Sequence, residues 1–234
     1  MKRNSGNALW LILLAVFLLG ALSAVLMRGS HNTEETGDFE RSSIKGSELL
    51  RYTSGMAQTV NKLLMNGCSE NDISFYSDKW TDNGYTYDNP NSPVAGGNFK
   101  CHVFNVQGGG YTWQPIPEGI SSVTDYYITG RNEVVGVGPN ATAGEGDLML
   151  VVPKVTQEVC RAINRSLKIE NYAKDGVETG LPFLGVYTPQ LGLLGDDNDN
   201  PEYVAGQKAF CMESITYSGM TDGDFFFVQI LQAR

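Results

Sequence analysis

Four cysteines and two histidines are the side chains of this sequence best suited to metal or redox chemistry. The cysteines stand at positions 68, 101, 160 and 211, and no C-x-x-C pair occurs among them. Metal sites need clustered ligands, so this spacing argues against a zinc centre. In an exported chain the same spacing predicts two disulfides, with four buried free thiols as the alternative. Of the three possible pairings we favour the pairing of sequence neighbours, Cys68 with Cys101 and Cys160 with Cys211.

An acidic stretch between residues 194 and 203 is the second candidate for ion chemistry. Carboxylate and amide oxygens at alternating positions suit Ca²⁺, which takes about six to eight oxygen ligands. The stretch lacks the glycine and the bidentate glutamate of an EF-hand loop, and a solvated acidic turn is the alternative interpretation. The candidate calcium ligands are Asp196, Asp197, Asp199 and Glu202.

The sequence lacks the common motifs of catalysis. It contains no G-x-S-x-G, no P-loop lysine motif and no H-E-x-x-H. A serine or cysteine nucleophile would need a base. His102 is a poor candidate for that base, because it lies beside Cys101, which is predicted to form a disulfide. The glycine-rich stretch from Gly136 to Asp147 lacks the lysine and the spacing of a nucleotide-binding loop, so we interpret it as a flexible loop. The sequence therefore predicts a protein that is not an enzyme and has no cofactor apart from the candidate calcium.

Five aromatic residues gather in loop-rich sequence between residues 80 and 113. Exposed aromatic side chains can stack on sugars or form subunit contacts, whereas buried ones pack in a core. We interpret this group as core and hairpin-pairing residues. Its members are Trp80, Tyr85, Tyr87, Tyr111 and Trp113.

The charge of the chain excludes one class of partner. The formal net charge is -9, charged residues are only 18%, and 27 residues are glycine. An acidic chain repels the phosphate backbone, so nucleic acid is not an expected partner. The low charged fraction, together with abundant glycine and aromatic residues, is typical of a loop-rich domain outside the cytoplasm.

The stretch from Ala8 to Met27 contains 20 residues and no charge. As a helix it would be about 30 Å long, which is the thickness of the hydrocarbon core of a bilayer. Lys2 and Arg3 precede it, whereas acidic residues follow soon after Arg28. The excess of basic residues before the helix predicts a cytoplasmic N-terminus and export of the remainder.

The first residues resemble the start of a type IV prepilin or pseudopilin. A short basic leader from Met1 to Gly6 is followed by the apolar helix, which begins at Asn7. In that family, prepilin peptidase cuts after the glycine, the new N-terminus is methylated, and the helix packs with other pilin-like subunits in a filament core. The resemblance thus implies Gly6 and Asn7 as processing residues. It also implies three partners: prepilin peptidase, other subunits and the lipid bilayer.

The same resemblance implies a single pass through a bacterial inner membrane with an exported C-terminal domain, or incorporation into an extracellular filament. Leu11 departs from the pattern, because major pilins carry a glutamate five residues after the cut. The departure favours a minor or atypical subunit, similar to minor pilins and to the tip pseudopilin of type II secretion. One alternative is a single-pass membrane-anchored binding or adhesion protein. The other is a soluble domain secreted by the Sec pathway and cut at the small residues Ala21 and Ser23.

Four segments position these residues. We expect a leader at 1–6, a transmembrane helix at 7–27, an amphipathic stalk helix at 28–66 with a small break at 28–30, and a globular extracytoplasmic domain at 67–234. An apolar stripe with helical spacing supports the stalk helix, and Asn66-Gly67 is a stop signal. The stripe consists of Leu49, Tyr52, Met56, Val60 and Leu63.

The globular domain is predicted to be α+β, with a mainly antiparallel sheet and one helix. The helix is expected at 156–169, with Thr156 as its N-cap. Strands are expected at 73–76, at 100–106, from residue 111, and at 209–215. Two more, at 126–129 and 133–137, are expected to flank a hairpin turn at 130–132. A strand at 148–152 should end at Pro153, and a strand at 225–231 should lie in the centre of the sheet.

Overall fold

The computed structural model describes residues 6–81, 84–138, 146–169, 174–187, 192–195, 204–216 and 220–234. Of residues 6–9, 25–36 and 192–193 it describes the backbone alone. The candidate calcium ligands Asp196, Asp197, Asp199 and Glu202 lie outside the described residues. The chain divides into two units, Met1–Arg41 and Ser42–Arg234, and the second is called the head.

Helix α1 extends from Gly6 to Met65. The break expected at residues 28–30 is wrong, since the backbone there is helical. A single glycine inside a helix costs only about 1 kcal/mol, so Gly29 lowers the stability of the helix without ending it. In the first part of α1 the structure describes side chains from Trp10 to Ala24 only. Within the described residues, no helix has both the length and the apolar character that crossing a membrane requires.

The part of α1 that belongs to the head carries the predicted apolar stripe. Leu49, Met56, Val60 and Leu63 are almost fully buried, so the stripe is confirmed. Burial of each side chain contributes about 2 kcal/mol of transfer free energy. The predicted stop is confirmed as well: Gly67 adopts a φ of 88°. Its N–H and that of Cys68 donate to the carbonyls of Leu64 and Leu63, which closes the helix with a Schellman motif.

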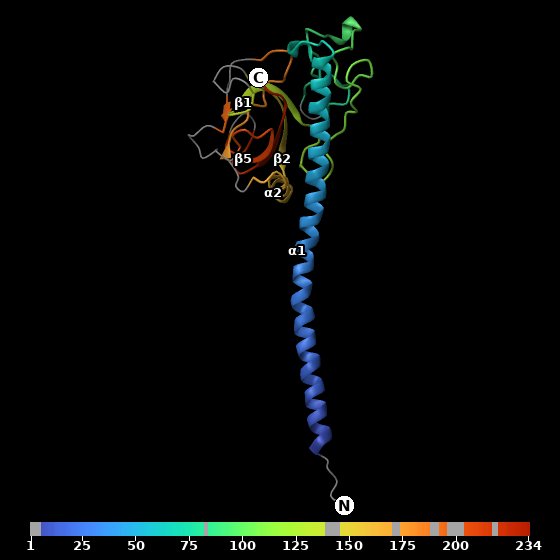
Figure 1. Ribbon diagram of the computed structural model, residues 1–234, viewed down its shortest axis with the longest axis vertical. Helices are drawn as coiled ribbons and strands as arrows, with labels where there is room; N and C mark the ends of the chain where they lie inside the picture. Colours follow the sequence, from blue (N-terminus) through green and yellow to red (C-terminus); the bar gives the residue numbers. More distant parts are fainter. Residues whose placement is uncertain are drawn as a thin grey trace, which may run out of the picture. The chain divides into compact units, whose positions relative to one another are not determined.

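A six-stranded sheet forms the centre of the head, in the order β3-β5-β6-β2-β1-β4. Figure 1 labels β1, β2 and β5 among its strands. Pairs β1–β2, β2–β6 and β5–β6 are antiparallel, whereas β1–β4 and β3–β5 are parallel. The predicted α+β class with a mainly antiparallel sheet is therefore confirmed. The strands are β1 Tyr127–Val134, β2 Asp147–Val155, β3 Lys174–Asp175, β4 Gly192–Leu194, β5 Ala209–Ser214 and β6 Phe225–Gln232.

Both faces of the central strands are covered, which explains why β2 and β6 read as continuous apolar runs. On one face, Leu150 and Phe227 share a core with α1 and with helix α2, Gln157–Ser166. On the other face, Met149 and Phe226 share a second core with residues from the connecting segments. The predicted central place of the last strand is confirmed, since β6 lies between β5 and β2.

Two expectations about strand ends are wrong. The hairpin predicted at residues 130–132 is absent from the described chain, because β1 continues through them with an irregularity in register between Thr129 and Asn132. A glycine inside a strand often marks such a bulge rather than a turn. Pro153 does not end β2 either; the strand extends to Val155, and a second register shift follows Val152.

The region between residues 68 and 125 contains much less strand than predicted. Only isolated bridges occur there among the described residues, such as Ser74 with His102. The 3-10 helices η1, Glu70–Asp72, and η2, Val94–Gly96, are its regular elements. Glycine and asparagine are unfavourable in β-strands, and this region is rich in both. Side-chain contacts, rather than strand pairing, therefore stabilise it. The helix predicted at 156–169 is confirmed in shorter form as α2, although the Thr156 side chain makes no capping bond.

Candidate functional site

The first disulfide joins Cys68, just after α1, to Cys101. Their Cα atoms are 5.8 Å apart. His102 follows at once and is buried, with its Nε2 atom 2.8 Å from the Ser92 carbonyl oxygen. Burial lowers the pKa of this histidine, which keeps the ring neutral at physiological pH. The disulfide thus fixes the irregular region to the end of α1, and the predicted pairing of Cys68 with Cys101 is confirmed.

The second disulfide joins Cys160 of α2 to Cys211 of β5, as predicted. Asn164 lies one turn after Cys160 and contacts the same strand residue. Its Nδ2 atom donates to the Cys211 carbonyl at 2.9 Å, and the Cys211 N–H donates to its Oδ1 atom at 2.8 Å. One helix face therefore holds Cys211 through both its side chain and its backbone.

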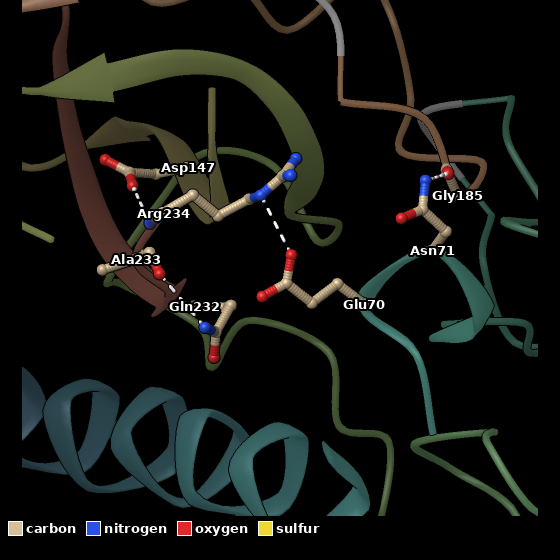
Figure 2. Close-up of polar contacts among 7 residues, drawn as sticks. All are labelled: Glu70, Asn71, Asp147, Gly185, Gln232, Ala233 and Arg234. Atoms are coloured by element: carbon tan, nitrogen blue, oxygen red, sulfur yellow. Dashed lines mark hydrogen bonds and ion pairs between the residues drawn. The ribbon is translucent and has the colours of Figure 1, made fainter. Parts of the chain in front are cut away.

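A group of polar side chains meets where β6 ends (Figure 2). The Arg234 N–H donates to Oδ1 of Asp147 at 2.9 Å, and the Val134 N–H donates to Oδ2 at 2.9 Å. The Arg234 guanidinium forms an ion pair with Glu70 of η1 at 3.0 Å and lies 4.0 Å from the ring centroid of Tyr187. This corner ties the first and last parts of the head together.

Asp147 is the most perturbed acid of this corner. Its side chain is completely buried, and this desolvation raises its pKa to about 6. The hydrogen bonds from Val134 and Arg234 act in the opposite direction, and the nearby Glu133 carboxylate adds to the rise. The flexible loop expected from Gly136 to Asp147 is thus wrong at its end, because Asp147 begins β2.

The aromatic group interpreted as core and pairing residues is confirmed as core. Trp80 lies at its centre, with its ring centroid 4.8 Å from Tyr87 and 5.7 Å from Trp113. Tyr87 is buried, and its hydroxyl accepts the Ile128 N–H of β1. Tyr85, Tyr111 and the two tryptophans are partly buried against the main core. These rings stabilise the region that lacks regular strands.

A small pocket lies between α1 and residues 114–117, with room for about one water molecule. Tyr52 and Tyr126 line it, and their hydroxyl oxygens are 3.0 Å apart. Burial raises the pKa of Tyr52 to about 12, so its hydroxyl stays protonated.

Nothing in the described ranges forms a metal centre, since no three His, Cys, Asp or Glu side chains come together there. The predicted processing residues Gly6 and Asn7 begin α1, and of these the structure describes only the backbone. Sequence reasoning missed the corner at Asp147 entirely. The signal that could have found it is a single carboxylate placed directly before the apolar run of β2.

The comparisons with known proteins add no relative. No protein-family model, no curated protein and no solved structure matches this chain.

Proposed function

We propose that this protein is a non-enzymatic, pilin-like structural subunit, anchored in a membrane or incorporated in a filament. The observation that carries the proposal is the surface of α1 before the head. Every described large apolar side chain from Trp10 to Leu22 is at least 42% exposed, and no charged side chain lies among them. A helix that is apolar on all sides needs a cover, which lipid chains or neighbouring apolar helices supply.

The way α1 ends supports a mechanical role. The same helix supplies Leu49, Met56, Val60 and Leu63 to the main core of the head, and the Cys68–Cys101 disulfide follows its last turn. Within the head, a force applied along this part of α1 acts on buried side chains and on a covalent bond. This is the property that a filament subunit needs.

The proposed location is the bacterial inner membrane, with the head exported, before any assembly into a filament. Its proposed partners are prepilin peptidase, other pilin-like subunits and the bilayer. Two disulfides agree with export, because such bonds persist in oxidising compartments. Leu11 in place of glutamate favours a minor subunit over a major one.

One alternative is a membrane-anchored binding or adhesion protein that keeps its leader, and Leu11 is the observation that favours it. The experiment that separates membrane association from secretion is fractionation of the native host, with the double variant Leu14→Arg/Phe17→Arg beside the wild type. Two charges in a bilayer core cost about 5 kcal/mol or more, so the variant should leave the membrane fraction. Wild-type protein found only in the medium, as a soluble monomer, would refute both membrane roles.

A further inference from the structure

The two disulfides of the head differ in how far solvent reaches them. Cys160 and Cys211 are both 0% exposed and lie inside the main core. Cys101 is partly exposed, and it is the one cysteine of the four that packs against this core without being buried in it. Its partner Cys68 is 7% exposed. A disulfide that solvent reaches is open to attack by a thiol, whereas a buried one is protected until the fold opens.

Both halves of the Cys68–Cys101 bond are held in place by contacts that do not involve sulfur. The Cys68 N–H donates to the Leu63 carbonyl at 3.1 Å, in the motif that closes α1. The Cys101 carbonyl accepts the Ser74 N–H at 3.0 Å, and the Ser74 carbonyl accepts the Val103 N–H at 2.9 Å. These contacts would keep the two sulfur atoms near each other after the bond opens, so that it forms again readily.

The attacking thiol must come from another molecule. All four cysteines of the chain are bonded in pairs, so the head contains no free thiol that could start an exchange. Access decides which sulfur atom is attacked, and Cys101 is the more exposed residue of its pair. Because Cys101 is only partly exposed, a small thiol compound reaches it more easily than a thiol on the surface of a protein.

We propose that Cys68–Cys101 is a thiol–disulfide exchange site for a small thiol compound, and that Cys160–Cys211 does not react while the head is folded. The thiolate of the small compound attacks the Cys101 sulfur and forms a mixed disulfide with it. The Cys68–Cys101 bond breaks, and its electron pair stays on Cys68 as a thiolate, which takes a proton from water. In the reverse step the Cys68 thiolate attacks the Cys101 sulfur, expels the small thiolate and restores the bond, so no further oxidant is needed.

Exchange at this site would release one of the two covalent ties of the head. The Cys68–Cys101 bond joins the end of α1 to the region that lacks regular strands, whereas the second disulfide would keep α2 on β5. The inference goes beyond the structural role proposed above. It holds whether or not the protein enters a filament, because all four cysteines lie in the head.

Reduced glutathione, added to the native full-length protein without denaturant, tests the site. An excess of N-ethylmaleimide stops the reaction and marks each released thiol, and peptide mass mapping then locates both labels. We expect glutathione on Cys101 and maleimide on Cys68, about tenfold or more faster than any label on Cys160 or Cys211, which serve as the control within the same molecule. Dilution of the glutathione before the maleimide is added should restore the Cys68–Cys101 bond.

The same reaction in urea, above the unfolding midpoint, shows whether burial causes the difference. There the two disulfides should react at similar rates. Four results would overturn the proposal. They are no adduct on the native protein at a glutathione concentration that opens the bond in urea, labels on Cys160 or Cys211 as early as on Cys101, glutathione on Cys68 in place of Cys101, and an unchanged difference in rate in urea.

Discussion

Asn164 and Cys211 form a reciprocal pair of hydrogen bonds in which an amide side chain takes the place of a neighbouring strand. The edge strand β3 pairs with β5 only at Glu213 and Ser214, so it does not reach Cys211. An open strand edge is a template for wrong pairing, and the helix side chain covers it. The disulfide from Cys160 holds α2 in place for this contact.

Replacing Asn164 with aspartate should destabilise the head by about 2 to 4 kcal/mol, because a carboxylate oxygen would face the Cys211 carbonyl without a hydrogen atom between them. Urea unfolding followed by circular dichroism measures the change. The control is Asn61→Asp, at an exposed amide that bonds to Ala57 within α1. It should cost less than about 0.5 kcal/mol. Equal losses in the two variants would contradict the role of the pair.

Removing either disulfide by double alanine substitution should lower the free energy of unfolding by about 4 kcal/mol. The bonds close segments of 33 and 51 residues, and loop entropy grows slowly with length, so the two losses should be similar. The measurement is chemical denaturation with and without reductant. Reductant should destabilise the wild type and leave the variant lacking all four cysteines unchanged. Labelling of free thiols in the untreated native protein would refute the bonds themselves.

Stability should fall between about pH 4 and pH 6 because of Asp147. Its pKa in the folded state is raised to about 6, from 3.8 in a free aspartate side chain. Over this interval the folded state retains a proton that the unfolded state has released, so rising pH favours unfolding. The proton on Asp147 stabilises the folded state by at most about 3 kcal/mol. This stabilisation is fully present below about pH 4 and is lost above about pH 6.

The Asp147 prediction is tested by the pH dependence of urea unfolding in Asp147→Asn. The difference between wild type and variant should change with pH only in this interval. Asp78→Asn, at an exposed carboxylate, is the control and should follow the wild type. A constant difference from pH 4 to pH 7 would contradict a raised pKa at Asp147.

Gly55→Ala should destabilise the head although alanine favours helix. The added Cβ would lie 2.7 Å from the Tyr111 hydroxyl oxygen and 3.2 Å from its Cε2 atom, so the ring must move. Overpacking of this kind costs about 1 to 3 kcal/mol. Gly37→Ala in the same helix has no atom within 4 Å of the new Cβ. It should gain up to about 1 kcal/mol in local helix stability, as hydrogen exchange would show. A stable Gly55 variant would mean that Tyr111 does not pack there.

The elements that could be predicted from the sequence are those whose spacing of apolar residues reflects which of their faces are buried. The stripe on α1, the apolar runs of β2 and β6, and the helix α2 all follow from which faces are covered. The region between residues 68 and 125 could not be predicted, because its order comes from long-range contacts such as Trp80 with Tyr126. The wrong hairpin prediction at Gly130 has a different cause: the sequence does not distinguish a glycine in a bulge from a glycine in a turn.

The site was predicted only where covalent chemistry limits the choices. The cysteine pairing was one of three possibilities, and neighbours in sequence proved to be partners in space. The corner at Asp147 was missed because its contacts come from Val134, Glu133 and Arg234, which sequence spacing does not place together. The amide pair of Asn164 was missed for the same reason.

The central claim, a pilin-like subunit, concerns the first residues of the chain, and intact mass spectrometry tests it most directly. The protein is extracted from membranes of its native host with its disulfides intact. A mass that begins at Asn7 and carries one added methyl group is the predicted result, and Gly6→Ala should block that cut. A mass that retains residues 1–6, or one that begins near Ala24, would contradict the account.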